Sequence, residues 1–221
     1  MNKRIVEAFV GEYASGKSEN AIARALALND LGRKVTLVDL DIVEPCYTLR
    51  PLKDELEGLG LDVLAWKTEQ TFGLGEAGQT ILPQARWALR REGDIIIDVG
   101  YGVDGARALN LLEGSATDPD FQVVLVLNAR RPMTDSVEMI EEYVEDIGRV
   151  DRIIANTHLA DETTPETVRD GYHIIKEVAT RRNIPIDAIS VSKQFIEKYP
   201  DFKLDNKEIR VLGAFMPRSF W

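Results

Sequence analysis

Five short runs of apolar residues recur along the chain, and they constrain its fold more than any other feature. Within each run, as in Ile95–Ile97, apolar side chains follow one another without alternating with polar ones. This pattern is typical of strands covered on both faces, and so of a parallel sheet between layers of helices. The runs are Arg4–Val10, Lys34–Asp39, Asp94–Val99, Phe121–Leu127 and Arg152–Ala155, and weaker strand candidates are Leu61–Trp66, Ile186–Val191 and Ile209–Ala214.

Segments with helical features lie between the predicted strands. Their termini carry the usual signals: a glycine, Gly32, follows the first segment, Thr134-Asp135-Ser136 offers cap oxygens to the third, and Pro165 suits the first position of the fourth. Because strand and helix alternate from end to end, we expect one domain over residues 1–221. We predict an α/β fold, a three-layer α/β/α sandwich with a mostly parallel, doubly wound central sheet. The predicted helices are Lys17–Leu31, Gln84–Arg91, Thr134–Ile147 and Thr164–Arg182.

The charge balance and the single cysteine limit the possible partners and compartments. The chain has 221 residues, with 27 Lys and Arg against 37 Asp and Glu, which gives a formal net charge of −10. An acidic chain repels phosphate backbones, so direct nucleic-acid binding is not expected. No apolar stretch approaches the roughly 18 residues that a transmembrane helix needs. The single cysteine, Cys46, fits a reducing compartment, so we expect a cytoplasmic protein.

The segment from Gly11 to Ser18 matches the phosphate-binding pattern G-x-x-x-x-G-K-[ST] in full. It follows a predicted strand and opens a predicted helix, as the mechanism requires. Glycines let the backbone turn so that successive N–H groups face phosphate oxygens, and the positive end of the helix adds to them. Lys17 would reach the β- and γ-phosphates, and the Ser18 hydroxyl would bind Mg²⁺. The predicted nucleotide-binding residues of this loop are Gly11, Glu12, Tyr13, Ala14, Ser15, Gly16, Lys17, Ser18 and Glu19.

Acidic residues at the ends of two further strands predict a metal site. Asp39 and Asp41 stand at the carboxyl end of the second predicted strand, where open α/β sheets bind ligands. Asp98 ends a buried strand and precedes a glycine-rich loop, Gly100–Gly105, which could respond to the γ-phosphate. We predict that Ser18, Asp41 and Asp98 hold Mg²⁺.

Together these segments resemble the CobQ/CobB/MinD/ParA family of SIMIBI-class P-loop NTPases. A further match is Arg152–Asn156, which is similar to the family's strand whose terminal asparagine contacts adenine. The resemblance implies ATP (or ADP) and Mg²⁺ as ligands, a homodimer formed through the nucleotide face, and a client protein. It implies that Asp41 positions the attacking water, that Lys17 and Asp41 are the catalytic residues, and that Asn156 contacts the base, with the Ser190–Gln194 loop closing over it.

Two details of the sequence refine this resemblance. After Asn156 the chain reads Thr-His-Leu, which does not supply the Asn-Lys-x-Asp guanine signature, so ATP is expected rather than GTP. Partitioning members of the family also carry a second lysine directly after the first glycine of the loop, and this chain has Glu12 there. Hydrolysis is therefore expected to be slow or to need a partner.

Three functions are compatible with these residues. The first is a Mg²⁺-dependent ATPase that acts as a nucleotide-dependent switch. The second is an ATP-dependent ligase or synthetase, similar to amidoligases or dethiobiotin synthetase, in which Arg130 or Arg131 would hold a small carboxylate. The third is a nucleotide-sensing module that does not hydrolyse ATP. The sequence does not identify the client or substrate, and it leaves the roles of Cys46, Arg130 and Arg131 open.

Overall fold

The computed structural model describes residues 3–42, 48–67, 70 and 81–216. Eight parallel strands form one sheet in the order β3-β2-β4-β1-β5-β6-β7-β8. All five apolar runs are strands, and so are the three weaker candidates. The strands are β1 Val6–Gly11, β2 Val35–Leu40, β3 Asp62–Leu64, β4 Asp94–Val99, β5 Phe121–Leu127, β6 Arg152–Ala155, β7 Ile186–Ser192 and β8 Glu208–Leu212.

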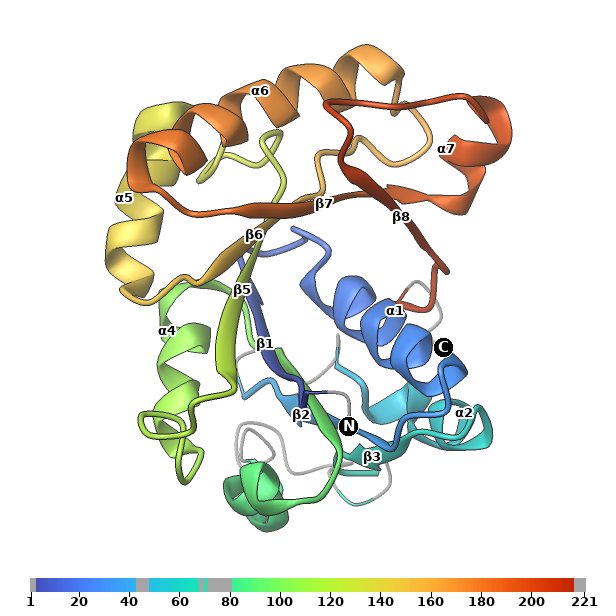
Figure 1. Cartoon of the computed structure of the whole chain (residues 1–221), viewed down its shortest axis with the longest axis vertical. Coiled ribbons are helices and arrows are strands. Elements are labelled where there is room, and N and C mark those ends of the chain that lie inside the picture. The colour runs from blue at the N-terminus through green and yellow to red at the C-terminus, as the bar shows by residue number, and fades with distance from the viewer. Residues whose placement is uncertain (1–2, 43–47, 68–69, 71–80, 217–221) are drawn as a thin grey trace.

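Helices cover both faces of this sheet, which confirms the predicted three-layer sandwich (Figure 1). Side chains of β1 alternate between two hydrophobic cores. Val6, Ala8 and Val10 pack in one core with α4, α5 and α6, whereas Phe9 packs in the other with α1 and α2. The helices are α1 Lys17–Asp30, α2 Lys53–Gly58, α4 Gly102–Arg107, α5 Val137–Ile147, α6 Pro165–Arg182 and α7 Lys193–Lys198, and the 3₁₀ helices are η1 Arg50–Leu52, η3 Pro83–Arg90 and η4 Ala108–Leu111.

The structure shows how the predicted helices begin and end. The Ser136 hydroxyl accepts a hydrogen bond from the Met139 N–H at the start of α5, and Thr164 begins α6 with a capping box. Gly32 follows α1 in a left-handed conformation. The segment predicted as helix Gln84–Arg91 is a 3₁₀ helix, because its buried Ala85 and Ala88 are three residues apart and so fall on one face at three residues per turn.

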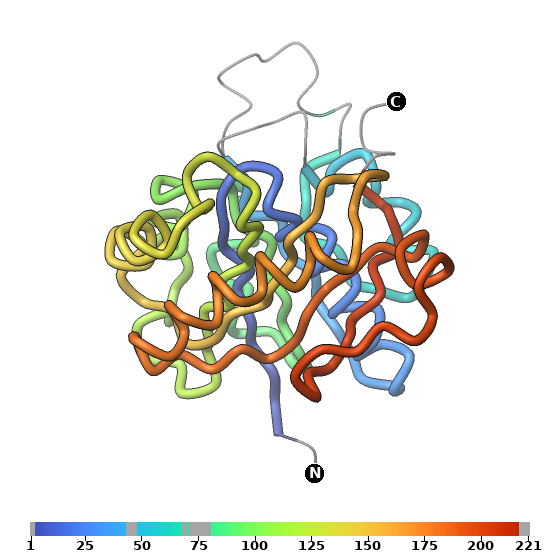
Figure 2. Tube along the Cα trace, turned by 90° about the horizontal axis from the view of Figure 1, so that it is seen from above, coloured from blue at the N-terminus to red at the C-terminus, as the bar shows by residue number. Residues whose placement is uncertain are grey.

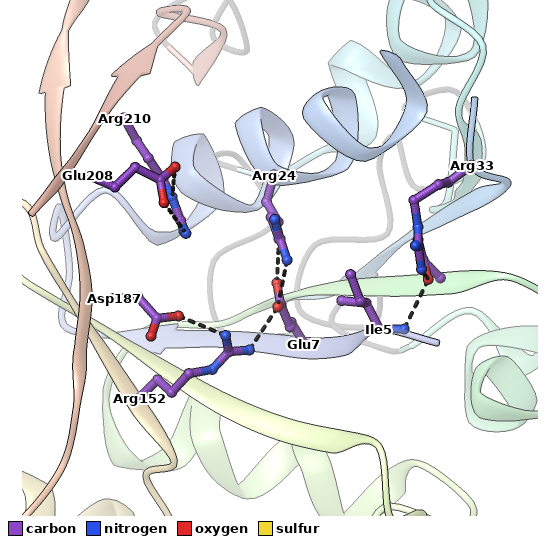
Figure 3. A network of polar contacts seen from close by, with 9 residues as sticks. Ile5, Glu7, Arg24, Arg33, Arg152, Asp187, Glu208 and Arg210 are labelled. Atoms are coloured by element: carbon purple, nitrogen blue, oxygen red, sulfur yellow. Dashed lines mark hydrogen bonds and ion pairs between the residues drawn. The ribbon is translucent and has the colours of Figure 1, made fainter. Parts of the chain in front are cut away.

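A buried ion cluster lies between the sheet and α1 (Figure 3). The Glu7 carboxylate accepts hydrogen bonds from Arg24 at 2.8 and 3.0 Å and from Arg152 at 2.7 Å, and Arg152 also pairs with Asp187. Burial by itself would raise the pKa of Glu7, but the hydrogen bonds and charges of the two arginines outweigh it and lower this pKa. The cluster therefore ties α1 to strands β1, β6 and β7 through a carboxylate that stays ionised.

The parallel strands all end at one edge of the sheet. In Figure 2 the chain enters at the bottom, and β1 runs upward to the edge where the loops after the strands gather. Open α/β sheets bind their ligands at this carboxyl edge. None of the helices within the described residues is long and apolar enough to cross a membrane.

Candidate functional site

The loop between β1 and α1 depends on two glycines. Gly16 has a φ of +88°, and a Cβ added there would overlap the side-chain amide of Asn156. A Cβ added to Gly11 would lie 2.6 Å from the Val126 carbonyl oxygen on β5. A side chain at either position would push the loop away from the sheet, so the motif's glycines are needed for its shape.

Side chains from neighbouring elements hold the carbonyl groups of this loop. The Asn156 amide donates to the Ser15 carbonyl at 2.7 Å, and the Asn20 amide donates to the Gly16 carbonyl at 2.9 Å. The His158 ring lies close to the backbone of Ala14. The C=O and N–H on one planar peptide group point in opposite directions. Fixing the carbonyls of Ser15 and Gly16 on one side therefore turns the following N–H groups to the other.

The N–H groups of Gly16, Lys17 and Ser18 have no hydrogen-bond partner within the described part of the chain. No side chain caps α1, whereas α5, α6 and α7 each begin with a hydroxyl cap. Unpaired N–H groups at a helix N-terminus form an anion-binding site. The loop is therefore open for an anion and is not filled by its own side chains.

These groups face a cavity of about 430 Å³. One end is lined by Lys17, Ser18, Asp41 and Tyr101. Lys17 is 7% exposed, and its Nζ lies 5.9 Å from the centre of the Tyr101 ring. This end brings a cation, a hydroxyl and a carboxylate together next to the open N–H groups, which are the groups that bind and polarise phosphate.

Three aspartates lie beneath this end of the cavity. Asp39 and Asp98 are register partners on β2 and β4, and the Asp41 N–H donates to Asp39 at 3.0 Å. Burial raises the pKa of Asp98 to about 8; Lys17 opposes the shift, and the charges of Asp41 and Asp39 add to it. Burial and Asp41 raise the pKa of Asp39 to about 7, although Arg50 lies 3.8 Å away.

Two of the three residues predicted to hold Mg²⁺, Ser18 and Asp98, offer oxygen atoms that suit this ion, and the third, Asp41, lines the cavity. Both carboxylate oxygens of Asp98 are fully buried without a well-formed hydrogen bond among the described residues, and the Ser18 hydroxyl lies near enough to lower the pKa of Asp98. Mg²⁺ prefers oxygen ligands and commonly takes only one or two from protein side chains. A dication beside Asp98 would stabilise the ionised carboxylate and so oppose the effect of burial, which raises the pKa of Asp98. Within residues 3–42, 48–67 and 81–216 there is no group of three or more His, Cys, Asp or Glu arranged as a metal site.

The rest of the cavity lining includes several apolar side chains and is called its apolar end below. It is formed by the loops after β6 and β7 and by the end of β8. The predicted base contact Asn156 lines it, with one amide hydrogen bonded to the P-loop, and the predicted Ser190–Gln194 loop contributes Val191, Ser192 and Gln194. Residues that the sequence did not single out for this end are Thr157, Ala160, Asp161, Thr163, Leu212, Ala214 and Met216.

The remaining predicted residues take varied positions. Tyr13 and Ala14 line the cavity, and the Tyr13 ring packs edge-on against Tyr101 with centroids 5.4 Å apart. Ser15 is buried, and Glu12 accepts a hydrogen bond from the Tyr13 N–H at 2.9 Å. Gly11, Glu12, Ser15 and Asp98 support the site without forming the cavity wall, and Glu19 lines it but turns its carboxylate toward the C-terminal segment.

Two of the residues left open in the sequence can be located. Arg130 pairs with Asp170 on α6 at 3.4 Å. Arg131 lies near His158, where it adds to burial in lowering the pKa of the imidazole. Cys46 lies outside the described residues.

A parallel sheet with a glycine-rich, anion-accepting loop between its first strand and first helix defines the P-loop NTPase fold. Solved structures share it. FtsY from Thermotoga maritima superimposes with a TM-score of 0.55 at 20% identity, over 86% of this chain and 62% of that chain. The signal recognition particle receptor FtsY from Elizabethkingia anophelis, solved with GDP, gives a TM-score of 0.58 at 18% identity, over 86% and 58%.

At this identity the likeness concerns the fold alone, which this chain shares with the FtsY structures. The structures named above are FtsY proteins, and they do not show the CobQ/CobB/MinD/ParA family that the sequence resembles. The chain spans about three-fifths of the length of the solved structures it matches. No family model and no curated protein matches the sequence.

Proposed function

We propose that this chain is a Mg²⁺-dependent nucleoside triphosphatase that works as a nucleotide-dependent switch. The observation that carries the proposal is the P-loop itself: its carbonyls are held by Asn156 and Asn20, and its open N–H groups face a cavity next to Lys17. Such an arrangement is matched to the negative oxygens of a phosphate chain.

Each residue at the phosphate end has a distinct task. Lys17 and the N–H groups stabilise negative charge on the β- and γ-phosphates. Ser18 and Asp98 hold Mg²⁺, which when bound neutralises charge between those phosphates. Asp41, at the cavity wall, orients the attacking water. Tyr13 and Tyr101 cover this end and limit the access of other water molecules.

We propose ATP as the nucleotide, because the residues after Asn156 do not form the Asn-Lys-x-Asp guanine signature. One structural neighbour was solved with GDP, so GTP is the alternative to be measured beside it. The ligase hypothesis is not taken further, because Arg130 pairs with Asp170 and neither Arg130 nor Arg131 lines the cavity.

A dimer formed through the nucleotide face is part of the proposal. Three large apolar side chains are exposed on loops at the carboxyl edge of the sheet: Tyr13 (47%), Met133 (53%) and Leu159 (42%). Apolar residues gathered around a ligand-binding mouth are suited to contact with a second protein surface. A client protein could use the same surface, and light scattering with and without ATP would separate the two.

The test measures binding and hydrolysis separately in the Lys17→Ala and Asp41→Ala variants. We expect Lys17→Ala to abolish ATP binding, and Asp41→Ala to keep binding and lose hydrolysis. Lys34→Ala is the matched control, because its exposed amine pairs with an exposed glutamate far along the chain. If Lys17→Ala and Asp41→Ala both hydrolyse ATP like the parent, the proposed function is wrong.

A further inference from the structure

The last described residues of the chain form part of the cavity wall at its apolar end. After β8 the backbone leaves the sheet edge, and Leu212, Ala214 and Met216 line the cavity. Ala214 has a φ of +56°, in the left-handed region. Segment 212–216 therefore changes direction at Ala214 and contributes three residues to the cavity wall.

A single carboxylate on α1 holds this segment. The Phe215 N–H donates to Glu19 Oε1 at 2.7 Å, and the Met216 N–H donates to Glu19 Oε2 at 2.9 Å. Glu19 is 8% exposed, so these hydrogen bonds are shielded from water. The side chains of Phe215 and Met216 pack on the same hydrophobic core that α1 covers. Polar and apolar contacts therefore fix the segment against α1.

Glu19 connects segment 212–216 to the phosphate site because of its position on α1. Glu19 lies two residues after Lys17, in the first turn of the helix that begins the phosphate site. A free carboxylate there would repel phosphate oxygens. Two N–H donors instead take up its charge, and they belong to segment 212–216, which forms part of the cavity wall. One helix turn therefore contacts both the phosphate end and the wall of the apolar end.

We propose that Glu19 is a positioning residue that holds segment 212–216 as the surface on which the base of the nucleotide packs. The proposal rests on the proposed nucleotide-binding function. Leu212 and Met216 offer an aliphatic chain and a thioether to the flat face of an aromatic base, a contact that methionine makes favourably. Glu19 itself does not touch the base.

The test separates binding of the base from binding of the phosphates. Calorimetry with Mg²⁺ measures the affinity for ATP (or GTP, if it binds more tightly) and for inorganic tripolyphosphate, which has no base. In Glu19→Gln one N–H loses its acceptor and faces an amide NH₂. We expect the nucleotide Kd to rise about tenfold and the tripolyphosphate Kd to change less than twofold. Met216→Ala should show the same selective loss, and Asp30→Asn, at the other end of α1, should change neither value.

The other outcomes overturn the proposal in distinct ways. If Glu19→Gln weakens both ligands equally, Glu19 acts through the P-loop and not through the base wall. If Glu19→Gln and Met216→Ala both bind the nucleotide like the parent, the segment is not a base-binding surface. If the parent binds neither ligand, the proposed function fails and this proposal fails with it.

Discussion

The P-loop geometry predicts a specific energetic coupling between Gly16 and Asn156. In Gly16→Ala the new methyl group overlaps the Asn156 amide, which must move and give up its 2.7 Å hydrogen bond to Ser15. A residue other than glycine in the left-handed conformation costs roughly 1–2 kcal/mol. Losing the hydrogen bond costs about 1 kcal/mol, and more if the buried amide stays unpaired. We therefore expect Gly16→Ala to lower the free energy of unfolding by about 2–4 kcal/mol.

A double-mutant cycle isolates the steric part of that loss. In an Asn156→Ala background the methyl group has room, so Gly16→Ala should lower the free energy of unfolding by only the conformational cost of roughly 1–2 kcal/mol. The effects of Gly16→Ala in the two backgrounds should therefore differ by a coupling free energy of about 1–2 kcal/mol. Urea unfolding of the four proteins measures it. Gly32→Ala is the control, because Gly32 also has a positive φ but its Cβ would meet nothing within 4 Å. A coupling below about 0.5 kcal/mol between Gly16 and Asn156 would refute the contact.

Two further predictions concern stability. Glu7→Gln should lower the free energy of unfolding at pH 7 by about 2 kcal/mol, because Arg24 loses its buried partner. In the folded protein the pKa of Glu7 lies below its ordinary 4.5. The parent should therefore be more stable than Glu7→Gln by the full amount above pH 4.5, and this difference should disappear as acid protonates the folded carboxylate. A difference in stability that persists in acid contradicts this. Thr164→Ala should lower the free energy of unfolding by about 1 kcal/mol because it removes the cap of α6, whereas Thr164→Ser keeps a hydroxyl cap and should not. Equal thermal unfolding of the two variants would show that the cap contributes nothing.

Most of the fold was predictable because its strands are buried on both faces, and continuous apolar runs record that burial directly. Phe121–Leu127 and Arg152–Ala155 match their observed strands residue for residue. The edge strand β8 was placed less well, as Ile209–Ala214 against Glu208–Leu212, because an edge strand keeps exposed and charged residues. Helices of six residues, such as α2 and α7, were missed, because they are too short to show a helical period.

The candidate site was predictable where its chemistry is local in sequence. The spacing of Gly16, Lys17 and Ser18 predicts the phosphate end, and the end of an apolar strand identified Asp98. The contact of Glu19 with Phe215 joins residues 196 positions apart, and its donors are backbone N–H groups that every residue but proline carries. No residue pattern records such a pairing, so only the structure reveals it.

The most direct test of the central claim is a crystal structure of the protein grown with Mg²⁺ and a non-hydrolysable triphosphate nucleotide. We expect phosphate oxygens within hydrogen-bond distance of the Gly16, Lys17 and Ser18 backbone nitrogens, with the Lys17 ammonium beside the terminal phosphates. A nucleotide bound elsewhere, with these nitrogens still unpaired, would contradict the account.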